Sequence, residues 1–195
     1  MFAVDSVWGI TVFWIAFAGW LIGETIVFRH GRSIDAPGED RDHGTVWLVL
    51  GLGFGAIVAA FVVAALFPSM KLPGGWVLMG LGLVLLVGGV GLRLWAVTVL
   101  GSFFQPTVTI QHEHRLITAG PYRFVRHPSY TGALLAELGI GLALGNAIGL
   151  VVLVVAPIVG YLPRIKAEEA ALLEAIGPEY AQYQRSSARL WPGVW

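Results

Sequence analysis

The stretch GPYRFVRHPSYTG, residues 120–132, holds the side chains best suited to chemistry in this sequence. It contains two arginines, one histidine, two tyrosines and two prolines, within a chain that is 56% hydrophobic. Pro128 biases His127 away from the helical region of backbone space, and Ser129 is a residue type that caps helices. We therefore expect a helix from Tyr130. His127 would lie on a rigid bend just before it, where side chain and backbone groups face a ligand.

A second polar segment, PRIKAEEAALLEAIGPEYAQYQ, begins at Pro163. Proline is favoured in the first turn of a helix, so we expect a separate C-terminal helix from Pro163 to Gly177. Arg164 and Glu168 are four residues apart and share one face of that helix. They form either a solvated ion pair or, in the functional interpretation, a positive and a negative group that point into a cavity.

Five apolar segments must position these side chains. Three of them exceed the roughly 18–20 residues that cross a bilayer as a helix, whereas the last two are shorter and are joined by a Gly145-Asn146 turn; the segments are 7–28, 45–67, 76–100, 130–144 and 147–162. The pattern predicts an all-α integral membrane protein with five transmembrane helices, the last two forming a tight hairpin. A buried helical hairpin that does not span is the alternative for the last two.

Lysine and arginine predict the orientation of the spans. Basic residues gather in the first and third connections and in the C-terminal tail, and are scarce in the other two connections. This distribution predicts an N-terminus outside and a cytosolic C-terminus. Glu24, Arg93 and Glu137 then lie in the cytosolic half of their spans. Charges inside a membrane are paired or functional, so we expect either an ion pair of Arg93 with Glu24 or Glu137, or a polar cavity.

Several classes of function are disfavoured. The chain has no cysteine, which excludes disulfides, thiolate metal sites and a cysteine nucleophile, and its zero net charge gives no indication of nucleic-acid binding. The GLGFG stretch, 51–55, lies inside a span and lacks the preceding strand of a dinucleotide site, so we attribute it and the glycines of 80–91 to close helix packing. The histidines of residues 112–114 and His127 do not have metal-ligand spacing, and we expect no metal. A loop that binds lipid headgroups is the non-catalytic interpretation of this cluster.

Four short motifs together resemble a known family. They are Gly120-Pro121-Tyr122, Arg126-His127-Pro128-Ser129-Tyr130, Arg164 with Glu168-Glu169, and Gly177 with Tyr180 and Tyr183. Their order and spacing are similar to those of the isoprenylcysteine carboxyl methyltransferase family, which is related to the membrane phospholipid methyltransferases. The resemblance covers roughly residues 98–192; the first two spans are similar only as apolar helices.

The resemblance implies a methyltransferase that uses S-adenosylmethionine without a Rossmann domain. A cytosolic segment before the fourth span and the C-terminal helix would form the cofactor pocket. One domain, 1–195, would then divide into three N-terminal spans, 1–100, and a cofactor-binding catalytic core, 101–195. The implied cofactor contacts are His114, Arg115, Leu116, Ile117, Tyr122, His127, Pro128, Ser129, Tyr130 and Glu168. Arg164 and Glu168 are the expected catalytic residues, and Arg164, Glu137 and Arg93 the expected substrate-binding residues.

The resemblance also implies a lipophilic or prenylated acceptor that enters from the inner leaflet of the bilayer. A carboxylate acceptor needs no general base, whereas an amine or thiol would, and His127, Glu168 and Glu137 are candidates for that base. N-methylation of a lipid amine and S-methylation of a thiol therefore remain alternatives. From another class, a non-catalytic membrane scaffold remains open; a transporter is disfavoured because no internal repeat is evident. The composition suggests a bacterial cell membrane, and the glycine-rich spans permit contacts between protomers.

Overall fold

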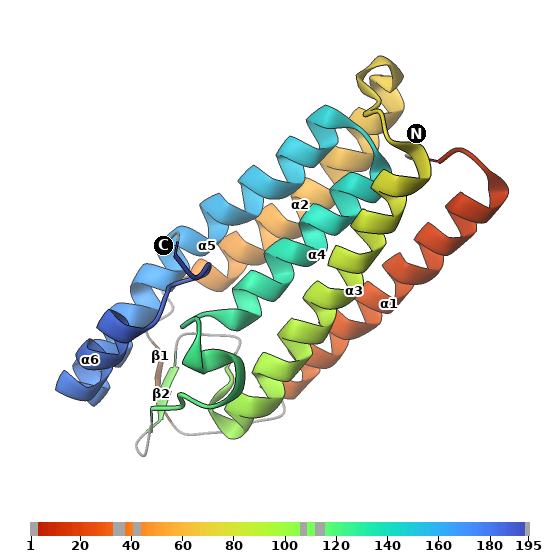
Figure 1. The fold of residues 1–195 in the computed structure, drawn as a ribbon. Coiled ribbons are helices and arrows are strands. Elements are labelled where there is room, and N and C mark those ends of the chain that lie inside the picture. Colours follow the sequence, from red (N-terminus) through yellow and green to blue (C-terminus); the bar gives the residue numbers. More distant parts are fainter. Residues whose placement is uncertain (1–3, 33–37, 41–43, 106–108, 112–115, 194–195) are drawn as a thin grey trace.

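A bundle of long helices dominates the structure, a computed structural model that describes residues 4–32, 38–40, 44–105, 109–111 and 116–193. The long helices are α1 (Val7–Arg32), α2 (Thr45–Leu66), α3 (Gly75–Leu100), α4 (Pro128–Leu144) and α5 (Ala147–Ile176), and α6 (Pro178–Ser186) follows α5 (Figure 1). Three short 3-10 helices connect them: η1 (Pro68–Met70), η2 (Gly101–Phe103) and η3 (Gly120–Arg123). A small antiparallel sheet of β1 (Gly38–Asp40) and β2 (Thr109–Gln111), which the sequence did not lead us to expect, lies beside the helices.

Four of these helices, α1, α2, α3 and α5, are long and apolar enough to cross a membrane. The predicted fold class, an all-helical multi-pass membrane protein, is confirmed. Helix α4 has 17 residues, or about 25 Å, which is shorter than a ~30 Å hydrocarbon core. Most of its residues are buried inside the bundle, where it packs against α3 and α5. The count of five spans therefore stays a prediction.

Helix α5 differs from the prediction of a fifth span followed by a separate helix. It runs without a break from Ala147 to Ile176 and contains both Pro157 and Pro163. A proline inside a helix removes one hydrogen bond, but the buried face of α5 continues on both sides of Pro163, through Tyr161 before it and Ile165 after it. Packing against α2 and α4 favours one continuous helix, and the expectation of a new helix at Pro163 was wrong.

Glycine packing between α3 and α4 holds the centre of the bundle. A Cβ added at Gly89 would lie 2.5 Å from the Gly132 carbonyl oxygen, and one at Gly82 would lie 2.6 Å from that of Gly139. Close packing was predicted correctly for these two α3 glycines. The same prediction was wrong for Gly80, Gly88 and Gly91 of α3 and for Gly51 and Gly55 of α2. An added Cβ at these positions meets nothing within 4 Å.

Replacing Gly89 by alanine is expected to lower the melting temperature of the protein in detergent. The added methyl overlaps backbone atoms of α4, and such overpacking typically costs about 1–3 kcal/mol. Gly91→Ala on the same helix is the matched control, because the new Cβ has open space and alanine is the better helix former. Equal melting temperatures for the two variants would contradict this account of the α3–α4 contact.

The turn between α4 and α5 is tied down at the end of the bundle away from the strands. Asn146 accepts a hydrogen bond from the Gly149 amide at 3.0 Å, which caps α5, and donates one to the Phe67 carbonyl at 2.9 Å. The predicted Gly145-Asn146 hairpin is therefore confirmed. The polar motifs lie at the opposite end, with β1, β2, α6 and the bend before α4 (Figure 1).

Candidate active site

The bend before α4 is fixed by the C-terminal segment of the chain. The amides of Arg126 and His127 donate to the carbonyls of Ala188 and Arg189, at 2.8 and 3.1 Å. Helix α4 begins at Pro128, with His127 in the N-cap position. The expectation that Ser129 caps a helix from Tyr130 was wrong, because proline fits the first helical turn, where its missing N–H loses no hydrogen bond.

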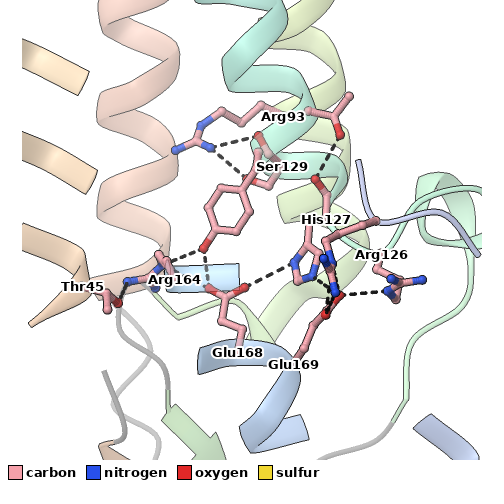
Figure 2. A network of polar contacts seen from close by, with 11 residues as sticks. Thr45, Arg93, Arg126, His127, Ser129, Arg164, Glu168 and Glu169 are labelled. Atoms are coloured by element: carbon pink, nitrogen blue, oxygen red, sulfur yellow. Dashed lines mark hydrogen bonds and ion pairs between the residues drawn. The ribbon is translucent and has the colours of Figure 1, made fainter. Parts of the chain in front are cut away.

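A partly buried group on α4 and α5 joins Tyr130 to Arg164 and Glu168; Figure 2 shows the last two beside each other. The Tyr130 hydroxyl donates to Glu168 Oε1 and accepts from Arg164 Nε at 2.6 Å. Arg164 Nε also lies 3.1 Å from Glu168 Oε1, and Arg164 Nη1 is 3.4 Å from the Thr45 hydroxyl of α2. Arg164 is only 3% exposed, so a solvated helix face is the wrong interpretation of this pair.

His127 lies between two carboxylates of α5. Its Nδ1 is 3.4 Å from Glu168 Oε2 and its Nε2 is 3.2 Å from Glu169 Oε1. Burial alone lowers the pKa of His127, but the hydrogen bonds to Glu168 and Glu169 outweigh burial, and the pKa is raised above its ordinary value of 6.5. Both ring nitrogens face carboxylate oxygens, an arrangement that favours the imidazolium form, which donates from both nitrogens.

The raised pKa of His127 predicts a loss of stability at alkaline pH. A pKa that is higher in the folded than in the unfolded protein contributes stability that is fully present below the unfolded value, near pH 6.5, and is lost as pH rises through the folded value. The melting temperature of the wild type should fall over this range more steeply than that of His127→Gln. Parallel pH profiles of the two proteins would contradict a charged His127.

Glu169 is the centre of a network for which the sequence analysis assigned no role. Arg126 Nε donates to Glu169 Oε1 at 3.0 Å, and Arg189 Nη2 donates to Oε2 at 2.7 Å. The two arginines and His127 thus converge on one carboxylate that is 6% exposed. This network ties α5 to the bend before α4 and to the C-terminal segment (Figure 2).

Replacing Glu169 by glutamine is expected to destabilise the whole protein. Removing one partner of a buried ionic network typically costs about 3–5 kcal/mol, because the remaining charges are left uncompensated. Thermal unfolding in detergent measures the effect. Glu179→Gln on α6, where the side chain is exposed, is the control and should shift the melting temperature little. A small shift for Glu169→Gln would show that the network is not structural.

The charges expected inside the membrane form one ion pair. Arg93 Nε lies 2.9 Å from Glu24 Oε1, which confirms the Arg93–Glu24 alternative. Arg93 Nη1 also donates to the carbonyl and the hydroxyl of Ser129, at 3.1 and 3.0 Å. Glu137 forms no ion pair with Arg93, and its Oε2 has no hydrogen-bond partner within the described residues.

A cavity of about 490 Å³ connects these groups. Its polar part is lined by His127, Ser129, Tyr130, Arg164 and Glu168. Its other wall is apolar and comes from the C-terminal half of α1 and the N-terminal half of α2, with Leu21, Val27, Phe28, Val46, Val49, Leu50 and Phe54. The buried Tyr180 of α6 also lines the cavity, and its hydroxyl has no hydrogen-bond partner among the residues that the structure describes.

Most of the expected site residues meet in this cavity. Leu116, Ile117 and Tyr122 line it together with Arg93 and the five polar residues named above. Pro128 is buried at the start of α4, and Glu137 lines a smaller pocket beside the cavity. His114 and Arg115 lie outside the described residues. Within 4–32, 38–40, 44–105, 109–111 and 116–193, no cluster of metal-ligating side chains is present.

Known proteins of one family are similar to this chain. The model of the isoprenylcysteine carboxyl methyltransferase family matches residues 81–174. A probable protein-S-isoprenylcysteine O-methyltransferase of Oryza sativa subsp. indica is 31% identical over 175 residues, which cover 84% of this chain and 90% of the relative. Protein-S-isoprenylcysteine O-methyltransferase A of Arabidopsis thaliana is 34% identical over 131 residues, 66% of each chain.

A solved structure is similar as well. The eukaryotic intramembrane Ras methyltransferase ICMT matches with a TM-score of 0.62 and 30% identity, over 73% of this chain. The match spans about half of that structure, 51% of its chain. The region matched by the family model, residues 81–174, contains the bend at His127 and the Arg164–Glu168 pair of α5. The chain therefore belongs to the isoprenylcysteine carboxyl methyltransferase family.

Proposed function

We propose that the protein is an integral-membrane methyltransferase that transfers a methyl group from S-adenosylmethionine to the carboxylate of a lipophilic, isoprenylcysteine-like acceptor. The observation that carries the proposal is the single cavity with a charged part at Arg164 and Glu168 and an apolar wall from α1 and α2. Such a cavity suits a polar cofactor and a lipophilic acceptor whose reacting groups meet at one point. Family membership supports the same reaction.

The residues present fit the proposed cofactor. Glu168 offers a carboxylate to positively charged groups, and Tyr122 and Tyr130 are aromatic rings of the kind that attract cations. The Tyr180 hydroxyl, which has no partner among the described residues, and the backbone of Leu116 and Ile117 would offer further polar contacts. Bound there, S-adenosylmethionine would supply an electrophilic methyl group to an attacking oxygen. His127 and Pro128 would hold the bend in place, and Ser129 would be oriented by Arg93.

Arg164 is the proposed anchor for the acceptor carboxylate. Its guanidinium is buried and oriented by Tyr130, Glu168 and Thr45, and its five donors match a carboxylate geometrically. The apolar wall would hold the lipid chain and exclude water, so the main contribution of the protein is positioning. We place the entry of the acceptor on the membrane side of the cavity, between α1 and α2, from the inner leaflet.

The contacts of the candidate bases favour carboxyl methylation over N- or S-methylation. Both nitrogens of His127 face carboxylates, and both oxygens of Glu168 already accept hydrogen bonds or pair with His127. Neither of these two groups is free to remove a proton. Glu137, the third candidate base, lines the smaller pocket, whose lining includes neither Arg164 nor Glu168. A carboxylate acceptor needs no proton removed, whereas an amine or thiol would.

The site would face the cytosol, with the N-terminus outside and the C-terminus inside. This orientation rests on the basic residues, which gather at the end of the bundle that carries Arg126 and Arg189. The soluble cofactor would enter from that side. The composition of the spans favours a bacterial cell membrane.

The proposal is tested by comparing acceptors that differ in one group. N-acetyl-S-farnesylcysteine, its carboxamide and farnesylamine are offered to the purified protein with methyl-labelled S-adenosylmethionine. Transfer to the free acid alone is the expected result. Transfer to the amine but not to the acid would overturn carboxyl methylation in favour of N-methylation.

A further inference from the structure

A second pocket lies beside the large cavity, deeper in the bundle. It has a volume of about 60 Å³ and is lined by residues of all five long helices, among them Trp20, Gly53, Ile57, Ala133, Glu137 and Tyr161. Glu24 and Arg93 line both cavities, so the small pocket adjoins the site directly. Its volume accommodates a small functional group, since holding one water takes about 10–15 Å³ of such space.

Glu137 is the unusual member of this pocket. It is 5% exposed, and its Oε2 atom has no hydrogen-bond partner in the part of the chain that the structure describes. Leaving a buried polar atom unpaired is costly, and most such atoms are paired in folded proteins. Gly53 of α2 faces the carboxyl group, because a Cβ built there would lie 3.8 Å from Glu137 Oε1; the glycine leaves the space beside Glu137 open.

Among the described residues, no hydrogen bond or ion pair reaches Glu137 Oε2. Arg93 is the cation of the group: its Nε faces Glu24 at 2.9 Å as an ion pair, and its Nη1 donates to the carbonyl and the hydroxyl of Ser129. The pocket therefore holds two carboxyl groups and one engaged guanidinium. The remaining lining is largely apolar, including Trp20, Ile57 and Ala133. An unpaired carboxyl oxygen beside this apolar lining suits a donor carried by an otherwise apolar chain.

We propose that the pocket at Glu137 is a subsite for a hydroxyl-type hydrogen-bond donor carried part-way along the apolar chain of the methyl acceptor. This rests on the proposed function, because the chain reaches the pocket through the large cavity. Glu137 follows Tyr130 by seven residues on α4, about 10 Å along the helix axis. The pocket at Glu137 therefore lies about two helical turns further along α4 than Tyr130, a separation within the length of an isoprenoid chain.

The test uses N-acetyl-S-alkylcysteines of one chain length, in which a single hydroxyl is moved along the chain, with the unsubstituted chain as reference. Binding is measured by thermal stabilisation of the purified protein, and methyl transfer is measured separately. One mid-chain hydroxyl position should bind the wild type about tenfold more tightly than the unsubstituted chain, a typical value for pairing a buried polar atom.

Three variants separate the subsite from general packing. Glu137→Leu should abolish the preference for the mid-chain hydroxyl and raise the melting temperature of the free protein, because it removes a buried unpaired atom. Glu137→Gln keeps a hydrogen-bonding side chain and should retain a preference. Ile57→Val changes the apolar wall of the same pocket and should change the affinity for all analogues by the same factor.

Each outcome decides one proposal. Equal binding of all analogues to the wild type, or a preference that survives Glu137→Leu, overturns the subsite and leaves the pocket as a water site. A positional preference in binding without methyl transfer supports the subsite and contradicts carboxyl methylation. Methyl transfer without a positional preference supports carboxyl methylation alone.

Discussion

Replacing Arg164 by alanine is expected to lower kcat for methyl transfer by about 10²-fold or more, the scale associated with a misplaced reactant. The proposed role of Arg164 is to hold the acceptor carboxylate beside the cofactor. Its guanidinium lies on the border between the charged part of the cavity and its apolar wall, oriented by Tyr130 and Thr45. Turnover with saturating N-acetyl-S-farnesylcysteine measures the effect.

Binding of S-adenosylhomocysteine to Arg164→Ala is the matched measurement. We expect its affinity to change only a few-fold, because the cofactor contacts are assigned to Glu168, the tyrosines and the bend at His127. Arg164→Lys keeps the charge but not the fork of donors, so it should recover part of the turnover. Loss of cofactor affinity equal to the loss of turnover would contradict an acceptor role for Arg164.

Glu168→Gln is expected to lower the affinity for S-adenosylhomocysteine by about 10–100-fold, the usual range for a hydrogen bond to a charged group. Glu168 lines the charged part of the cavity and its side chain is 22% exposed, whereas the neighbouring Glu169 pairs with two arginines and is not among the lining residues. Titration calorimetry on the purified protein measures the affinity directly.

Two controls sharpen the Glu168 experiment. Glu174→Gln lies on the exposed surface of the same helix and should leave the affinity unchanged. The melting temperature of Glu168→Gln reports whether the group of Tyr130 and Arg164 is still folded. Unchanged affinity in a folded Glu168→Gln protein would contradict the placement of the cofactor beside α5.

The parts of the fold that follow local patterns were predicted from the sequence. Long apolar runs predicted the spanning helices, and the Gly145-Asn146 pair predicted the hairpin. The family resemblance, which rested on the His127 and Arg164 motifs, is confirmed by the comparisons. Both motifs line one cavity as expected, while the roles assigned to their residues stay predictions.

Errors arose where tertiary contacts outweigh local preference. Pro163 is a good first-turn residue, yet α5 continues through it because its buried face continues. Ser129 has a capping side chain, yet Pro128 begins α4 and Arg93 binds the Ser129 hydroxyl instead. In each case a partner that is distant in the sequence decides the local structure.

The site residues that were missed depend on distant partners in the same way. Glu169 is adjacent to Glu168 in the sequence, but its role follows from Arg189, twenty residues further along the chain. The apolar wall of the cavity comes from α1 and α2, which are hydrophobic on every side, so no periodicity distinguished the residues that face the cavity from those that face lipid.

Carboxyl methylation at the membrane is tested by the stability of the transferred methyl group to base. Purified protein is incubated with methyl-labelled S-adenosylmethionine and a lipid extract supplemented with a farnesylated cysteine analogue, and the lipid phase is then treated with base. Release of the label as methanol identifies a methyl ester and is the result that we predict. Label that enters the lipid phase and resists base would identify N- or S-methylation and contradict the account.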